Sequence, residues 1–159
     1  SDDEIVSKNL FKKINYAFKD DKLNFIYGDC DIVKRFNKNI IIRKWKSKKI
    51  FERKYFEVEM PAHTTFFIRK KIFSKLLYDT KFTISSDFDF LIKLFKNYQG
   101  KYINKVFIKM RTGGKSSQLK NFYLKMQEDV RILSKKYKYN FLLVYILKLI
   151  LKIKKKIIF

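Results

Sequence analysis

The spacing of apolar residues along the chain predicts alternating helices and strands. Helical spacing is clearest over residues 86–97, where Phe90, Leu91 and Leu94 fall on one face. A longer helix is expected over 118–136 and a short one over 70–77. The chain is also expected to open with a helix that is capped by Ser1 and ends at residues 20–21. Its apolar stripe would contain Ile5, Leu10, Ile14 and Phe18.

Short apolar runs between these helices predict strands. Residues 24–27 are expected to form a buried strand that ends in a turn at Gly28 and Asp29. Residues 32–33 and 40–42 predict a hairpin, and strands are also expected over 64–68, 102–103 and 106–108. Residues 43–58 have no clear period and are interpreted as a loop with some extended structure, and 112–117 as a glycine- and serine-rich loop. The alternation indicates an α/β or α+β domain.

The last twenty residues differ in character from the rest. If residues 140–159 form a helix, one face is apolar and the opposite face carries lysines. The apolar face contains Ile146, Leu149, Ile150, Ile153 and Ile157. This pattern is typical of a basic amphipathic helix that lies on a membrane surface. The alternative is a terminal helix packed on the domain with its lysines in water. We therefore divide the chain into residues 1–137 and a C-terminal helix over 138–159.

The net charge of the chain restricts the kinds of partner that it can bind. The 159 residues include 38 Lys and Arg but 15 Asp and Glu, which gives a formal net charge of +23. Such a charge favours nucleic acid, anionic lipid head groups or phosphorylated sugar carriers, although a solvated lysine-rich surface would explain it equally well. The single cysteine, Cys30, excludes an internal disulfide and suits a reducing cytosolic compartment. The longest apolar run, over 141–147, is far shorter than the roughly 20 residues that span a bilayer.

Three acidic clusters stand out in this basic chain. They lie at residues 1–3, 28–31 and 85–89, and carboxylates of this kind can hold a divalent cation or accept a proton from a hydroxyl. Each also has a plain structural explanation. Asp2 and Asp3 would favour the positive end of a helix dipole, Ser86 and Asp89 would form a capping box, and Asp29 would be a turn residue.

The order of these clusters together with two further segments resembles a known family. The set comprises Ser1-Asp2-Asp3, Tyr27-Gly28-Asp29, residues 60–66 (MPAHTTF), residues 86–91 (SDFDFL) and residues 110–116 (MRTGGKS). In this order it resembles the second half of family-two glycosyltransferases, of the type that builds bacterial cell-surface polysaccharide, up to about residue 137. The resemblance implies the C-terminal portion of a GT-A (Rossmann-like) fold, with a mixed sheet flanked by helices, followed here by the amphipathic helix.

The resemblance also implies roles for particular residues. In the family, a short acidic motif holds Mn²⁺ or Mg²⁺ against the donor diphosphate, and Asp2 matches it, with Asp3 adjacent. The family's catalytic base is an Asp at the start of a helix, and Asp87 matches that position. Many relatives carry a Glu before this Asp, whereas this chain has Ser86. Donor or acceptor binding is implied for His63, Asp89, Arg111, Gly113, Gly114 and Lys115.

Several of these residues have simpler interpretations. His63 could be a buried, hydrogen-bonded histidine, and residues 111–116 could form a plain glycine turn. Trp45 could stack on the acceptor or anchor a loop, and the anchor is the favoured interpretation. The match begins after the N-terminal unit that binds most of the donor nucleotide in the family, so we expect this chain by itself not to turn over.

We therefore expect an inverting, metal-dependent glycosyltransferase at the cytoplasmic face of the inner membrane. It would transfer a sugar from a nucleotide-sugar donor to a hydroxyl of a glycan or a lipid-linked acceptor. The alternative is a non-catalytic basic module that binds nucleic acid or a membrane surface. Nucleic acid is the less favoured partner, because the lysines are dispersed and no DNA- or RNA-binding motif occurs.

Overall fold

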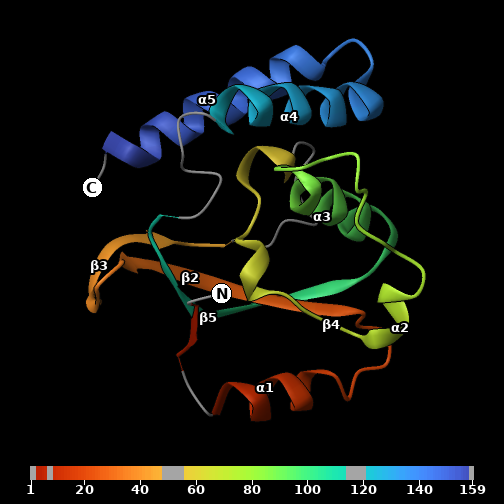
Figure 1. Ribbon diagram of the computed structural model, residues 1–159. Helices are drawn as coiled ribbons and strands as arrows, with labels where there is room; N and C mark the ends of the chain where they lie inside the picture. Colours follow the sequence, from red (N-terminus) through yellow and green to blue (C-terminus); the bar gives the residue numbers. More distant parts are fainter. Residues whose placement is uncertain (1–2, 7–8, 48–55, 114–120, 158–159) are drawn as a thin grey trace.

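The computed structural model describes residues 3–6, 9–47, 56–113 and 121–157, in which a mixed β-sheet has helices on both faces (Figure 1). The strands are β1 (Glu4–Ile5), β2 (Phe25–Lys34), β3 (Asn37–Trp45), β4 (Phe67–Ile68) and β5 (Gly100–Arg111). Their order is β1-β5-β2-β3, and β4 also pairs with β2. Strands β2 and β5 are parallel, whereas the other pairs are antiparallel.

The helices form layers above and below this sheet. Helix α1 (Asn9–Ala17) covers one face and α3 (Ser86–Asn97) the other, while α4 (Phe122–Tyr137) and α5 (Phe141–Ile157) form a hairpin beyond α3 (Figure 1). The short helix α2 (Lys70–Phe73) and two 3₁₀ turns, η1 (Phe56–Glu59) and η2 (His63–Thr65), complete the described elements. The expected α/β class with a mixed sheet flanked by helices is confirmed at this level.

Three apolar clusters hold the layers together. One joins the sheet to α3 and includes Phe25, Tyr27 and Leu94. The second joins the sheet to α1 and includes Ile14, Ile26 and Phe107. The third lies between α3 and the α4–α5 hairpin; its members are Phe82, Phe88, Ile92, Ile132, Leu133, Val144 and Tyr145. Strand β2 contributes to both sheet faces because successive side chains of a strand point in opposite directions.

The turn that the sequence predicted at Gly28 and Asp29 is wrong, because β2 continues through both residues. Gly28 serves the packing of the sheet instead. A Cβ atom at this position would lie 2.5 Å from Cδ1 of Phe107, so the ring of Phe107 occupies the space that a side chain would need. Asp29 is fully buried within the strand. It accepts hydrogen bonds from the Ser47 amide (2.8 Å) and the Tyr102 hydroxyl (2.9 Å).

The start of the first helix is also corrected. Glu4 and Ile5 form strand β1, which pairs with Lys109 and Ile108 of β5, and α1 begins only at Asn9. The proposed cap, Ser1, lies outside the described residues. The body of the helix agrees with the prediction, because Leu10 and Ile14 are buried against the sheet.

Helix α3 has the predicted bounds, but the predicted capping box is wrong. The residue before the helix is Ser85, and its side chain makes no capping hydrogen bond. Instead, the Ser85 hydroxyl donates to Asp129 Oδ1 (2.7 Å), and Asp89 pairs with Lys93 one turn along the helix (2.5 Å). Contacts from α4 therefore fix this helix end.

The C-terminal helix is present, but its faces are arranged differently from the prediction. Lys148 was expected to face water; its Nζ atom instead lies 2.9 Å from Asp129 Oδ2 and 3.3 Å from the centre of the Phe88 ring. Burial lowers the pKa of Lys148 to about 8, against the opposing effect of Asp129. Leu149, predicted on the membrane-facing stripe, packs against the third cluster. No helix in the described ranges is long and apolar enough to cross a membrane.

Candidate active site

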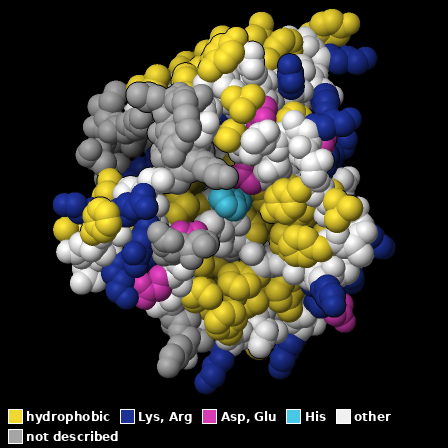
Figure 2. Space-filling view, viewed as in Figure 1, with side chains coloured by type: hydrophobic (Ala, Val, Ile, Leu, Met, Phe, Trp, Pro, Cys, Tyr) yellow, Lys and Arg dark blue, Asp and Glu magenta, His cyan; other side chains and the backbone are white. Residues whose placement is uncertain are grey.

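The structure brings His63 and Asp87 into direct contact, although 23 residues separate them in the sequence. His63 Nδ1 lies 3.1 Å from Asp87 Oδ2, and the two side chains are 51% and 37% exposed. His63 belongs to η2 and Asp87 to the first turn of α3. In Figure 2 the histidine lies near the centre of the face that is shown, beside acidic side chains. The pair is therefore within reach of a ligand in solution.

Each member of the pair shifts the pKa of the other. The hydrogen bond with Asp87 and its negative charge raise the pKa of His63 above its ordinary value, although partial burial opposes the shift. Burial works to raise the pKa of Asp87, but the hydrogen bond from His63 and the charges of His63 and Lys125 outweigh it and lower that pKa. The carboxylate is thus ionised at neutral pH, as a proton acceptor must be.

Three further polar groups surround the pair. The negative charge of Asp3 raises the pKa of His63 and also that of Cys30. Lys125 approaches from α4 and lowers the pKa of both His63 and Asp87. The pKa of Tyr78 is raised by burial and by the charge of Asp87. Residues from five separate parts of the chain therefore interact electrostatically at this surface.

Local contacts hold Asp87 in a partly exposed position, whereas the two residues after it are buried. The Phe88 amide donates to Asp87 Oδ1 (2.8 Å), which fixes the carboxylate at the start of α3. The Phe88 ring and the Asp89 side chain are buried on either side of the helix. Of the two carboxylates in residues 85–89, Asp87 is thus the one that is exposed to solvent, whereas Asp89 is buried. Asp89, for which ligand binding was implied, is instead held by Lys93.

The segment before α3 is held by carboxylates from α4. Glu128 accepts hydrogen bonds from the backbone amides of Thr83 (2.8 Å), Ile84 (2.9 Å) and Ser85 (2.7 Å). Glu128 is almost completely buried, so these hydrogen bonds are shielded from water and strong. They fix the backbone that leads into Asp87, and no local pattern in the sequence indicates them.

The remaining residues implied by the resemblance are not joined to the pair in the described structure. Arg111 ends β5, where its Nη1 donates to the Arg35 carbonyl (3.3 Å). Gly113 has a φ of 104°, which favours glycine, and lies close to the Arg35 side chain. Asp2, Gly114 and Lys115 lie outside the described residues. Trp45 is a loop anchor, as predicted, since its Nε1 donates to the Met60 carbonyl (3.2 Å).

The described residues do not by themselves fit a metal site. Within residues 3–6, 9–47, 56–113 and 121–157, no three His, Cys, Asp or Glu side chains gather closely enough to hold an ion. Asp3 supplies one carboxylate beside the pair, and hard cations such as Mg²⁺ and Mn²⁺ need several oxygen ligands. The metal assigned to Asp2 and Asp3 stays a prediction.

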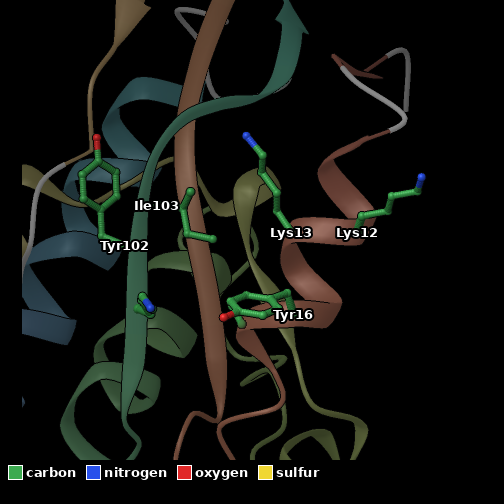
Figure 3. A pocket seen from close by; sticks show the side chains of 7 residues that line it. Lys12, Lys13, Tyr16, Tyr102 and Ile103 are labelled. Atoms are coloured by element: carbon green, nitrogen blue, oxygen red, sulfur yellow. The ribbon is translucent and has the colours of Figure 1, made fainter.

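A separate groove lies on the α1 side of the sheet, and neither His63 nor Asp87 lines it. It has a volume of about 470 Å³ and is lined by Lys12, Lys13, Tyr16 and Ala17 of α1 and by Lys101, Tyr102 and Ile103 of β5 (Figure 3). Figure 3 shows the amino groups of Lys12 and Lys13 extending away from the groove. The groove therefore offers mainly apolar surface and no cluster of groups that could carry out a reaction.

Comparisons with models of protein families and with curated proteins found no match. An ionised, partly exposed carboxylate beside an imidazole can accept a proton from a hydroxyl group, and a nearby lysine can attract an anionic ligand. That combination suits a reaction in which a hydroxyl group becomes a nucleophile.

Proposed function

We propose that this chain is the acceptor-side part of an inverting glycosyltransferase of the GT-A type. The observation that carries the proposal is the contact between His63 and Asp87. It pairs the Asp at the position expected for the family's base with the His expected on the acceptor side. The mixed sheet flanked by helices is compatible with a Rossmann-like domain of this kind.

In the proposed reaction, Asp87 accepts the proton of an acceptor hydroxyl. The hydroxyl oxygen then forms a bond to the anomeric carbon of the donor sugar, while the bond from that carbon to the nucleoside diphosphate breaks. The diphosphate leaves with the electron pair from the face opposite the attack, so the configuration is inverted. The acceptor would be a glycan or a lipid-linked sugar, and the donor a nucleotide sugar.

His63 positions Asp87 in this proposal. When the imidazole is protonated, it forms an ion pair with the carboxylate and weakens it as a base. When the imidazole is neutral, its Nδ1–H still orients the carboxylate without neutralising it. Turnover is therefore expected to rise with pH as His63 loses its proton, and the midpoint should lie above the ordinary histidine pKa because that of His63 is raised.

The first prediction is that Asp87→Asn abolishes turnover but preserves donor binding. It should be measured on the protein expressed from its complete gene, with a panel of sugar nucleotides, Mn²⁺ or Mg²⁺, and release of nucleoside diphosphate as the readout. Loss of a general base should reduce kcat by about 10²–10⁴-fold. Asp21→Asn is the matched control, since the Asp21 side chain is 97% exposed and lies outside the site.

The possible outcomes distinguish a glycosyltransferase from a non-catalytic basic module. Turnover of one donor by the wild type and the control, and its loss in Asp87→Asn, would support the proposal. The proposal fails if no donor binds, or if Asp87→Asn turns over at the wild-type rate. Salt-sensitive binding of nucleic acid without donor binding would favour the non-catalytic basic module.

A further inference from the structure

Helix α5 exposes an apolar stripe on the side that faces away from the domain. Val144 and Tyr145 are buried, and Lys148 points inwards to Asp129. Between 44% and 57% of each side chain on the outward stripe is exposed; these residues are Leu142, Leu143, Ile146, Ile150 and Ile153. Their spacing follows one side of a helix. Apolar side chains extend along the top edge of the molecule in Figure 2.

Helix α5 differs from an ordinary surface helix because apolar side chains lie on both its inward and its outward faces. A helix at the edge of a water-soluble domain normally turns its apolar stripe to the core and its lysines to water. Here Lys148 is placed inside, where burial lowers its pKa, while five branched apolar side chains face out. A contiguous apolar surface of this kind indicates an interaction site.

The charge around the stripe indicates the chemistry of the partner. Residues 121–157 contain ten Lys and Arg but only two acids, Glu128 and Asp129. Both acids are buried, 3% and 4% exposed, so the described surface of the hairpin carries no exposed carboxylate. An anionic partner is attracted to such a surface. A second copy of this chain, which also carries +23, is repelled.

We propose that the outward face of α5 binds the surface of an anionic lipid membrane. The helix has 17 residues and is therefore roughly 25 Å long. Its inner side is fixed to α4 and η1 by packing, so it would lie in the plane of the membrane with the stripe among the acyl chains. Lysines beside the stripe would meet the phosphate head groups. Nucleic acid provides anionic groups but no apolar layer for the stripe.

Docking in this way would place the candidate site close to the membrane. Lys148 of α5 contacts the ring of Phe88, the residue after Asp87, and Asp129 of α4 holds Ser85 just before it. Direct contacts therefore link the α4–α5 hairpin to the start of α3. This consequence for the acceptor, a hydroxyl carried on a membrane lipid, rests on the proposed function, whereas the docking itself does not.

Sedimentation with vesicles tests the docking. The full chain is mixed with vesicles of phosphatidylcholine alone or of phosphatidylcholine with phosphatidylglycerol. Binding is expected only to the anionic vesicles. The variant Ile146→Glu/Ile150→Glu should reduce the partition coefficient at least about tenfold, because two apolar side chains can no longer enter the acyl region and two anions are added.

A matched control variant distinguishes the contribution of the apolar stripe to vesicle binding from the effect of added negative charge. Phe36→Glu/Leu77→Glu adds the same charges at two apolar side chains that are 91% and 72% exposed elsewhere. It should lower vesicle binding much less than the α5 variant does, and both variants should melt at the wild-type temperature. Equal losses in the two variants would mean that net charge alone drives binding, which overturns the proposal.

Two other results would also overturn it. One is the absence of binding to anionic vesicles by a folded wild-type protein. The other is a dimer in sedimentation velocity that Ile146→Glu/Ile150→Glu dissociates, which would assign the stripe to a second copy of the chain. Neither result depends on donor turnover, so failure of the docking proposal and failure of the proposed enzyme are distinguishable.

Discussion

At the scale of single residues, His63 and Asp87 form a pair whose protonation is mutually dependent. Their Nδ1 and Oδ2 atoms lie 3.1 Å apart, with Asp3 and Lys125 near enough to shift the pKa of His63 in opposite directions. The pKa of His63 is raised and that of Asp87 is lowered. Both groups are therefore charged over a range of pH below the folded pKa of His63 and above that of Asp87.

This pairing predicts the titration of the only histidine. The imidazole resonances of His63 can be followed by NMR without overlap from another histidine, since the chain has one. The pKa of His63 should lie above 6.5 in the wild type and fall in Asp87→Asn, which removes the largest cause of the shift. Asp3→Asn should lower it by a smaller amount. An unchanged pKa in Asp87→Asn would mean that the contact is absent in solution.

The same shifts determine how the pair affects stability. Because the folded pKa of His63 is raised, its contribution is complete below its unfolded pKa and is lost as pH rises through the folded value. Because the folded pKa of Asp87 is lowered, its contribution is present above its unfolded pKa and is lost as pH falls through the folded value. The difference in stability between wild type and Asp87→Asn should therefore be largest at mildly acidic pH.

At the scale of elements, α4 organises the start of α3. The Ser85 side chain does not cap α3, and the Glu128 carboxylate binds three amides of the segment before the helix. Asp129 binds the Ser85 hydroxyl, so two consecutive acids of α4 hold the segment. Glu57 of η1 is fully buried and bonds to Lys136 and the Tyr137 hydroxyl. Buried carboxylates thus join elements that lie far apart in the sequence.

We predict that Glu128→Gln destabilises the fold by about 2–3 kcal/mol, because charge-assisted hydrogen bonds become weaker and one side-chain oxygen becomes a donor facing amides. Denaturant unfolding measures the loss, with Asp21→Asn as the exposed control. Hydrogen exchange should locate the effect, with faster exchange at the amides of residues 83–85. Unchanged protection of these amides would refute the assigned role of Glu128.

At the scale of the whole molecule, the burial of apolar side chains stabilises the fold and the net positive charge destabilises it. Three apolar clusters join successive layers of the structure: α1 to the sheet, the sheet to α3, and α3 to the α4–α5 hairpin. The net charge of +23 is spread over this structure, and repulsion between like charges destabilises the compact state relative to the unfolded chain. Ion pairs such as Lys46 with Asp29 offset part of the repulsion.

Added salt is therefore predicted to stabilise the protein. Raising sodium chloride to physiological ionic strength shortens the screening length to about 8 Å and weakens the repulsion, so the melting temperature should rise. Lys12→Gln/Lys13→Gln, which removes two exposed charges from α1, should be more stable at low salt and respond less to added salt. A melting temperature that falls with salt would show that ion pairs outweigh the repulsion.

The sequence by itself determined those features that depend on neighbouring residues. Helical spacing in 86–97 fixed the bounds of α3, and so the place of Asp87 in its first turn, because periodic burial needs only the local chain. The hairpin of β2 and β3 and the helical character of 141–157 follow for the same reason. The mixed α/β class could also be inferred from the alternation of elements.

Only the tertiary structure decided the features that depend on distant partners. Gly28 looked like a turn until the ring of Phe107 explained it, and Glu4 and Ile5 became a strand only because β5 lies beside them. A sequence shows that α5 has two faces but cannot say which one packs inwards; the buried Asp129 carboxylate draws Lys148 inside and leaves the apolar stripe exposed. Likewise, His63 and Asp87 meet only because η2 and α3 pack against the same sheet, since strand pairing and ion pairing are settled by long-range contacts.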